Sequence, residues 1–123
     1  MKFLHAMIRV KNLEESMRFY KELIGLKQLN ELRLDDCTLY FLGSKEGETQ
    51  VELTYNDETP EVGYNQGRAF GHFAFEADSM GEFTERLNSL GYKYLYEPFE
   101  LAGLKVAFLN DPDGNEIEII EKV

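Results

Sequence analysis

The sequence is short of cysteine and of positive charge, and both shortages narrow the possible functions. Its single cysteine, Cys37, excludes an intramolecular disulfide and favours a reducing, cytoplasmic setting. Lysine and arginine together number 13 against 23 aspartates and glutamates, which gives a formal net charge of −10. Nucleic acids and anionic membrane surfaces are bound through basic patches. We therefore expect neither a nucleic acid nor a membrane as a partner.

Long apolar runs are also missing. No stretch of 18 apolar residues is present to span a membrane, and residues 1–5 lack the apolar stretch and cleavage site of a signal peptide. With 123 residues and 43% hydrophobic content, the chain is expected to form one compact domain, or two small modules that share a core.

Histidine occurs only twice, and the two histidines mark an internal repeat. His5 precedes Glu52 by 47 positions, and His72 precedes Glu118 by 46. A single histidine in an apolar strand is more often a packed residue than a ligand, and a single strand glutamate is usually solvated. The repeat changes that balance, because a unit of about 60 residues is used twice and each copy carries one imidazole and one carboxylate. Two imidazoles and two carboxylates suit a divalent metal ion.

The apolar pattern predicts the order β-α-β-β-β in each half. In the first half, strands are expected at 4–10, 26–32, 38–42 and 50–55. Its helix should begin at Asn12 as N-cap and end at Gly25, with the apolar residues Leu13, Met17, Tyr20 and Ile24 recurring at helical spacing.

In the second half, strands are expected at 71–77, 92–96, 105–109 and 116–120. The helix between the first two should begin at Ser79, end at Gly91, and bury Met80, Phe83, Leu87 and Leu90.

The predicted fold class is α+β, with two βαβββ modules forming a curved mixed sheet around a metal-containing cleft. One domain would span 1–123, with module 1 at about 1–57, a polar linker at about 58–67, and module 2 at about 68–123. Cys37 lies in a strand-like run without basic neighbours in sequence, which indicates a packed thiol and not a nucleophile.

Several segments together resemble a known family. They are Leu4-His5-Ala6-Met7-Ile8-Arg9-Val10, Val51-Glu52-Leu53-Thr54-Tyr55-Asn56, Gly71-His72 and the run from Asp111 to Glu118. This combination is similar to the glyoxalase I (lactoylglutathione lyase) family of the vicinal-oxygen-chelate superfamily, which has the glyoxalase/bleomycin-resistance fold. The resemblance covers nearly the whole chain.

The resemblance implies both a ligand set and a reaction. The metal ligands would be His5, Glu52, His72 and Glu118, which are the residues that the repeat selects. The substrate would be the hemithioacetal of methylglyoxal and glutathione, or another small thiol, which is isomerised through an enediolate to the S-lactoyl thioester. Glu118 would be the leading catalytic base and Glu52 the second.

The resemblance also implies a thiol-binding set, a metal preference and an assembly. Arg9 and Arg68 would each meet a carboxylate of the thiol, and Asn56 would bind its peptide group. Ni²⁺ or Co²⁺ is favoured over Zn²⁺, because His5 at the first ligand position and the short chain resemble the nickel-activated branch of the family. A homodimer is expected, since the family pairs modules across a two-fold axis. The 101–105 loop has no confident counterpart in the family.

Other members of the superfamily supply the rival interpretations. Methylmalonyl-CoA epimerase performs similar metal-assisted proton transfer, but the Glu-Leu-Thr-Tyr-Asn segment at 52–56 fits glyoxalase I better. Fosfomycin-modifying thiol transferases are also relatives, and extradiol dioxygenases use only two histidines and one carboxylate. A non-enzymatic binding protein of the bleomycin-sequestering type needs no metal, which the four intact ligands argue against.

Overall fold

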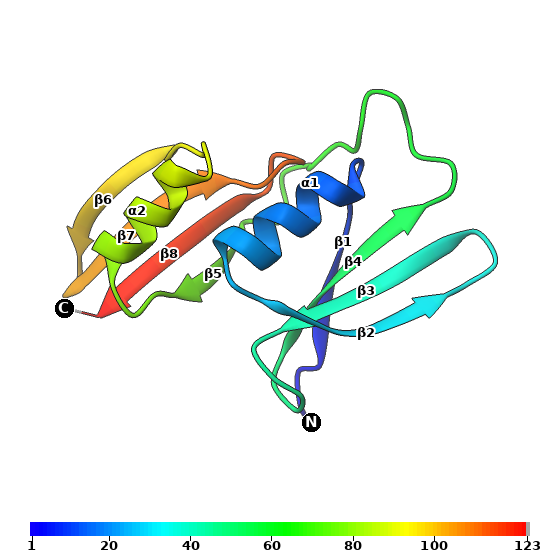
Figure 1. The fold of residues 1–123 in the computed structure, drawn as a ribbon, viewed down its shortest axis with the longest axis horizontal. Coiled ribbons are helices and arrows are strands. Elements are labelled where there is room, and N and C mark those ends of the chain that lie inside the picture. The colour runs from blue at the N-terminus through cyan, green and yellow to red at the C-terminus, as the bar shows by residue number, and fades with distance from the viewer. Residues whose placement is uncertain (123) are drawn as a thin grey trace. The chain divides into compact units, whose positions relative to one another are not determined.

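The computed structural model describes residues 1–122 and separates into two compact units, Met1–Asn65 and Gln66–Val123 (Figure 1). Each unit follows the predicted order of one strand, one helical segment and three further strands. No helix in the described part of the chain is long and apolar enough to cross a membrane.

The first unit holds a four-stranded mixed sheet in the order β1-β4-β3-β2. Parallel pairing joins β1 to β4, whereas β3 runs antiparallel to both of its neighbours. Its elements are β1 (His5–Arg9), α1 (Leu13–Met17), the π-helical segment η1 (Arg18–Leu23), β2 (Lys27–Arg33), β3 (Cys37–Gly43) and β4 (Gln50–Asn56).

The first helical segment begins as predicted but buries a different face. The Asn12 side chain accepts a hydrogen bond from the Glu15 backbone N–H, and Gly25 ends the segment with a φ of +90°. Of the apolar residues at helical spacing only Tyr20 is fully buried. The segment turns into a π-helix, in which the Ile24 N–H reaches the Phe19 carbonyl five residues back. The fully buried face is therefore Ser16, Phe19, Tyr20 and Leu23, whereas Leu13, Met17 and Ile24 are half-buried.

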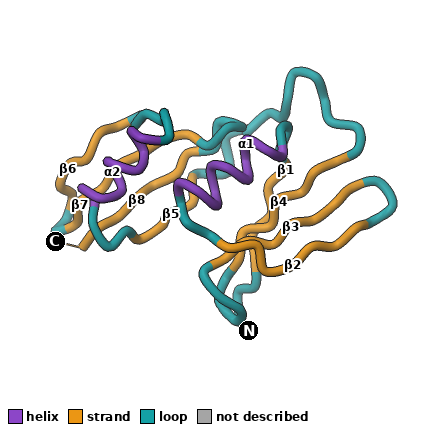
Figure 2. The backbone as a smooth tube through the Cα atoms, in the orientation of Figure 1, coloured by secondary structure: helices purple, strands orange, loops and turns teal. Residues whose placement is uncertain are grey.

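The second unit repeats this topology with the strand order β5-β8-β7-β6, in which β5 pairs with β8 in parallel. Its helix is capped by the Ser79 hydroxyl, which accepts from the Glu82 N–H, and it buries Met80, Phe83 and Leu87 as predicted. Figure 2 shows this helix lying along the strands of its own sheet. The elements are β5 (His72–Glu76), α2 (Met80–Ser89), β6 (Tyr96–Leu101), β7 (Leu104–Asn110) and β8 (Glu116–Lys122).

One strand of this unit lies later in the chain than predicted. The strand expected at 92–96 is β6, which begins only at Tyr96. Ala102 and Gly103 both have positive φ and make a tight turn into β7. The 101–105 segment is therefore a hairpin turn, which sets the pairing of β6 with β7. The register shifts between Tyr96 and Phe99, around Pro98, which has no N–H to contribute to the ladder.

The predicted α+β class and the two βαβββ modules are confirmed, with one difference in the sheets. A single curved sheet is expected from the sequence, whereas the structure has two four-stranded sheets, one in each unit. In each sheet the strand residues on one face are apolar and buried, as with Leu42 and Leu53 in the first unit and Ile117 and Ile119 in the second. The opposite face is left for polar side chains, because neighbouring strand residues point to opposite sides.

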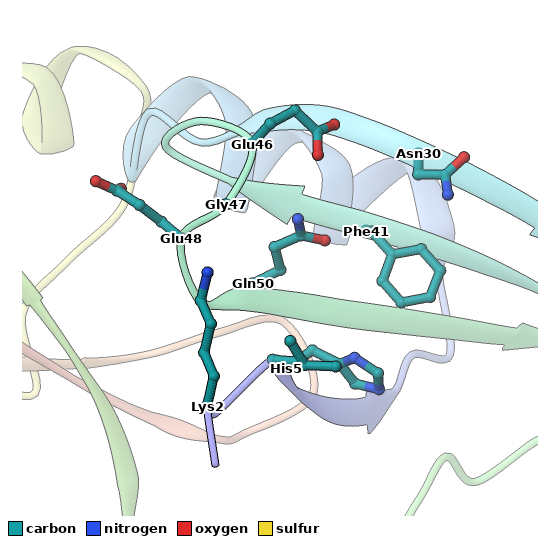
Figure 3. A pocket seen from close by; sticks show the side chains of 9 residues that line it. Lys2, His5, Asn30, Phe41, Glu46, Gly47, Glu48 and Gln50 are labelled. Atoms are coloured by element: carbon teal, nitrogen blue, oxygen red, sulfur yellow. The ribbon is translucent and has the colours of Figure 1, made fainter.

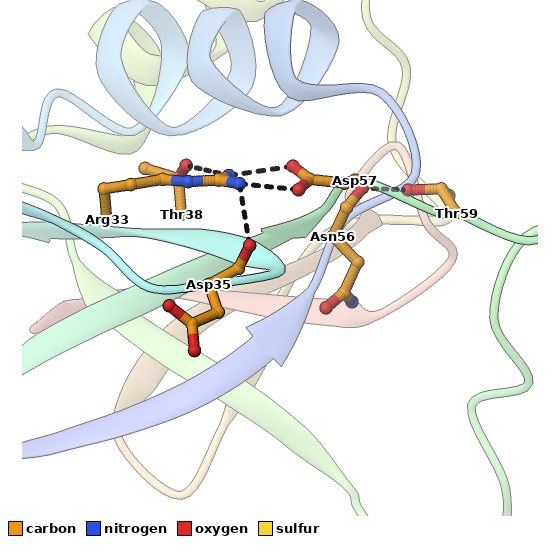
Figure 4. A network of polar contacts seen from close by, with 6 residues as sticks. All are labelled: Arg33, Asp35, Thr38, Asn56, Asp57 and Thr59. Carbon is orange, nitrogen blue, oxygen red and sulfur yellow. Dashed lines mark hydrogen bonds and ion pairs between the residues drawn. The ribbon is translucent and has the colours of Figure 1, made fainter.

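An ion pair joins the last residue of β2, Arg33, to Asp57, which directly follows β4 (Figure 4). The Arg33 guanidinium donates to both carboxylate oxygens of Asp57, at 2.8 and 2.6 Å. It also donates to the Thr38 hydroxyl and to the Asp35 carbonyl. The hydrogen bond from Arg33 holds the pKa of the Asp57 carboxyl below its ordinary value.

We expect Asp57→Asn to lower the melting temperature at neutral pH and to have less effect in acid. A carboxyl whose pKa is lower in the folded state stabilises the fold above its ordinary pKa of about 3.9, and this contribution is lost as the pH falls through the lowered value. Thermal unfolding of both proteins should therefore converge towards about pH 2. The control is Glu58→Gln, which removes a neighbouring charge without breaking the Arg33 pair. An equal loss of stability in both variants, or a loss for Asp57→Asn that is constant with pH, would contradict this account.

Candidate metal centre

The first His–Glu pair lies on the polar face of the first sheet. The parallel register sets His5 opposite Gln50, so that Glu52, two residues further along β4, shares its face. His5 Nε2 lies 3.1 Å from Glu52 Oε1. The other carboxylate oxygen, Oε2, accepts a 2.8 Å hydrogen bond from the Thr54 hydroxyl. Glu52 is thus a buried carboxylate with both oxygens engaged.

The second pair repeats this arrangement in the other unit. His72 is set opposite Glu116 in the parallel register of β5 and β8, and Glu118 follows two residues later on the same face. His72 Nε2 lies 3.0 Å from Glu118 Oε2. The Glu118 side chain is 16% exposed, compared with 9% for Glu52. The matched offsets in the sequence therefore correspond to matched positions in the fold.

Two aromatic residues belong to this arrangement, and the sequence analysis missed them. The Phe41 ring packs edge-on against the His5 imidazole, with 5.4 Å between centroids, and Phe108 packs in the same way on His72 at 5.6 Å. Phe41 is paired with Glu52 in the ladder, and Phe108 with Glu118. The sequence did contain a signal for these two residues. Phe41 and Phe108 are 67 positions apart, and so are His5 and His72, so the phenylalanines occupy equivalent positions in the repeat.

The donor spacing suits two neighbouring ligands of one six-coordinate ion. Donor atoms bound at right angles, each about 2.1 Å from an ion, lie about 3.0 Å apart, whereas a tetrahedral angle separates them by about 3.4 Å. The imidazole nitrogen and carboxylate oxygen are 3.1 Å apart in the first pair and 3.0 Å apart in the second. Hydrogen bonds hold each pair together at the same distance. Little rearrangement is needed for either pair to bind an ion.

The structure gathers the four predicted ligands as two pairs, one in each unit. Among residues 1–122, no group of three or more histidine, cysteine, aspartate or glutamate side chains is placed to hold a metal ion. Each unit therefore supplies half of the predicted ligand set.

An open pocket of about 290 Å³ adjoins His5 of the first pair (Figure 3). His5 and Phe41 lie at one end of it, and Lys2 and Gln50 lie towards the other. Its full lining is Lys2, Leu4, His5, Asn30, Phe41, Glu46, Gly47, Glu48 and Gln50. The space beside His5 is therefore lined by both apolar side chains, Leu4 and Phe41, and polar or charged ones.

The three predicted thiol-binding residues occupy different settings. Arg9 is exposed on β1 and shares the face of His5. Asn56 is half-buried at the end of β4, where its side-chain amide donates to the Tyr64 hydroxyl at 2.9 Å. Arg68 is exposed in the segment between β4 and β5. Arg9 and Asn56 thus lie on the face of the first sheet that carries His5 and Glu52, whereas Arg68 belongs to the second unit.

The one cysteine takes no part in this arrangement. Cys37 is buried at the start of β3, and burial is the main reason that the pKa of its thiol is raised. A raised thiol pKa lowers the thiolate fraction, which is the reactive form. The prediction of a packed thiol is confirmed.

The sequence matches the family described as the glyoxalase/bleomycin resistance protein/dioxygenase superfamily over residues 2–119. The chain belongs to this superfamily.

Within the superfamily, proteins similar to this chain include lactoylglutathione lyases. One from Neisseria meningitidis is 38% identical over 99% of this chain and 91% of its own length. Another, from Haemophilus influenzae, is 35% identical over 98% of this chain and 93% of its own. The trypanothione-dependent glyoxalase I of Leishmania major has the same fold, with a TM-score of 0.84 and 35% identity over 99% of this chain and 87% of that one. The chain therefore groups with the glyoxalase I enzymes.

Proposed function

We propose that this protein is a lactoylglutathione lyase, which isomerises the hemithioacetal of methylglyoxal and a small thiol to the S-lactoyl thioester. The observation that carries the proposal is the pair of equivalent His–Glu contacts, His5 with Glu52 and His72 with Glu118. The near full-length similarity to lactoylglutathione lyases supports it independently.

We propose that these four residues, from one chain or shared between two chains, are the ligands of a divalent metal ion. When bound, the ion supplies Lewis-acid stabilisation of the negative charge that develops on the two substrate oxygens. The donor set supports such an ion, because imidazoles and carboxylates are ligands for divalent first-row metals, whereas a structural zinc site is usually rich in cysteine. Ni²⁺ or Co²⁺ is the proposed ion and Zn²⁺ the alternative, because His5 at the first ligand position resembles the nickel-activated branch of the family.

Glu118 is the proposed catalytic base. The reaction removes a proton from the carbon that bears sulfur and returns one to the neighbouring carbon. A carboxylate can carry that proton if it reaches the substrate carbon. Glu118 is the more exposed of the two carboxylates, and Glu52 is held by the Thr54 hydroxyl. Glu52 is the proposed second base.

The thiol is proposed to be glutathione, bound by Arg9, Asn56 and Arg68. Arg9 and Asn56 lie at the carboxyl ends of β1 and β4, beyond the metal pair along the same face. A protein with a net charge of −10 needs local cations to bind an anionic thiol, and two guanidinium groups meet that need. The single buried thiol of Cys37 supports the proposed cytoplasmic setting.

A second candidate function keeps the metal and changes the substrate. A methylmalonyl-CoA epimerase also moves a proton beside a carbonyl group, and the pocket next to His5 leaves room for a different substrate. Assays of both substrates on one metal-loaded preparation separate the two. Turnover of methylmalonyl-CoA without hemithioacetal isomerisation would replace our proposal.

Removal of the metal should abolish activity, and Ni²⁺ or Co²⁺ should restore it better than Zn²⁺. The proton transfer depends on the stabilisation of negative charge that the bound ion would supply. Thioester formation should be followed by absorbance, with chelated protein reloaded with each ion and with glutathione or another thiol. Highest turnover with Zn²⁺ would refute the nickel assignment, and full activity in chelator would refute the metal site.

Glu118→Gln should reduce kcat by about 10² to 10⁴-fold, because glutamine keeps the size and one oxygen ligand but cannot accept the proton. Metal content should be measured on the same preparation, with His72→Ala as the comparison variant that loses a ligand outright. We expect Glu118→Gln to retain more metal than His72→Ala does. Near-normal kcat in fully metallated Glu118→Gln would overturn the base assignment and leave proton transfer to Glu52.

We also propose that the protein is a homodimer. Small units bury a modest share of their surface on folding, and large apolar side chains such as Met7, Leu32 and Phe99 remain exposed on the strands of this chain. Sedimentation at micromolar concentration should give a species of twice the 14.3 kDa chain mass. A single 14.3 kDa species would exclude the dimer.

A further inference from the structure

The two halves of the repeat differ at the residue that follows each glutamate by two positions. In the first half this residue is Thr54, whose hydroxyl donates a 2.8 Å hydrogen bond to Glu52 Oε2. In the second half it is Ile120, whose side chain has no polar atom to donate. The two positions are equivalent. Each lies on the strand that is last in the chain order of its unit, β4 or β8, and on the same face as the glutamate.

The contact between Thr54 and Glu52 is well shielded from water. As whole residues, Glu52 is 6% exposed and Thr54 is 5% exposed. The Thr54 backbone is fixed as well, since its carbonyl accepts the Val10 N–H at 3.1 Å. A buried carboxylate that leaves such a donor loses a hydrogen bond that water cannot replace. Thr54 therefore restricts Glu52 to the orientation in which Oε1 faces His5.

We propose that Thr54 is a positioning residue that would hold Glu52 in its metal-ligand orientation, while the apolar Ile120 donates no such hydrogen bond to Glu118 and would leave its carboxylate able to accept the substrate proton. The inference rests on the proposed function. Glu52 and Glu118 are chemically identical, and we attribute their different roles to one difference between the repeats. The residue two positions later is a threonine in the first half and an isoleucine in the second. Hydrogen bonds that orient metal ligands commonly contribute to both metal affinity and activity.

The first test removes the hydroxyl with little change in volume. Apo protein should be titrated with Ni²⁺ in the wild type, Thr54→Val, Thr54→Ser and the control Thr38→Val. Thr38 is another strand threonine of the same sheet, and its hydroxyl accepts a hydrogen bond from the Arg33 guanidinium. We expect Thr54→Val to weaken Ni²⁺ binding by about 10 to 100-fold. Thr54→Ser, which keeps the hydroxyl, and Thr38→Val should both bind Ni²⁺ like the wild type.

Wild-type affinity in Thr54→Val would overturn the proposal, as would a Thr54→Ser variant as weak as Thr54→Val. Thermal unfolding of each apo protein accompanies the titration. A fall in Ni²⁺ affinity that simply follows the loss of stability, in Thr38→Val as much as in Thr54→Val, would make Thr54 a structural residue and also overturn the proposal.

The second test introduces the missing hydroxyl beside Glu118. Ile120→Thr gives the second half the donor that the first half has. We expect kcat to fall at full metal occupancy, while the affinity for Ni²⁺ is retained or increased, because the added hydroxyl holds Glu118 in its ligand orientation. An unchanged kcat at equal metal content would contradict the part of the proposal that concerns Glu118.

The two measurements separate this inference from the function on which it rests. If the wild type binds Ni²⁺ but does not isomerise the hemithioacetal, the proposed function fails while the titrations still decide the role of Thr54. A wild type that does not bind Ni²⁺ would overturn the metal site and the role of Thr54 together.

Discussion

Parallel pairing between the first and last strands of each unit is the constraint on which the site depends. In an antiparallel hairpin, neighbours in space are close in the sequence, but β1 and β4 are separated by the helical segment and two strands. Their parallel register nevertheless brings His5 within 3.1 Å of Glu52, and the same register in the second unit brings His72 within 3.0 Å of Glu118. A slip of one residue would turn either glutamate to the opposite face of its sheet. The buried apolar residues that alternate with the site residues therefore also keep the two His–Glu pairs in place.

In each sheet, one face packs into the hydrophobic core and the opposite face carries the residues of the candidate site. Leu53 is fully buried on β4 next to Glu52, and Ile117 and Ile119 are buried on either side of Glu118. The apolar face supplies the hydrophobic stabilisation, which frees the opposite face to carry imidazoles and carboxylates. Phe41 and Phe108 support the site face by packing on the histidine rings. The same construction appears in both units, which is the structural form of the repeat in the sequence.

The repeat is not perfect, and its differences bear on function. Both units supply one imidazole and one carboxylate, yet only Glu52 has a threonine two residues later to hold it. Arg9 and Asn56 have their place in the first unit, whereas Arg68 lies in the second. A duplicated unit provides a symmetric ligand set, and the chemistry that we propose needs an asymmetric one, with a fixed ligand and a mobile base.

The sequence by itself determined the order of elements, the helix caps at Asn12 and Ser79, and the two His–Glu pairs, because these depend on local chemistry and on a regular spacing. It did not determine which face of the first helical segment is buried, since the π-helical turn after Met17 shifts the buried residues. It also misplaced β6, because the hairpin turn at Ala102 and Gly103 sets where pairing begins.

Only the tertiary structure decided which oxygen of Glu52 faces His5 and that Thr54 binds the other. Spacing in a sequence can place two residues on one face of a strand, but the hydrogen bond between them depends on burial and on the exact register of neighbouring strands.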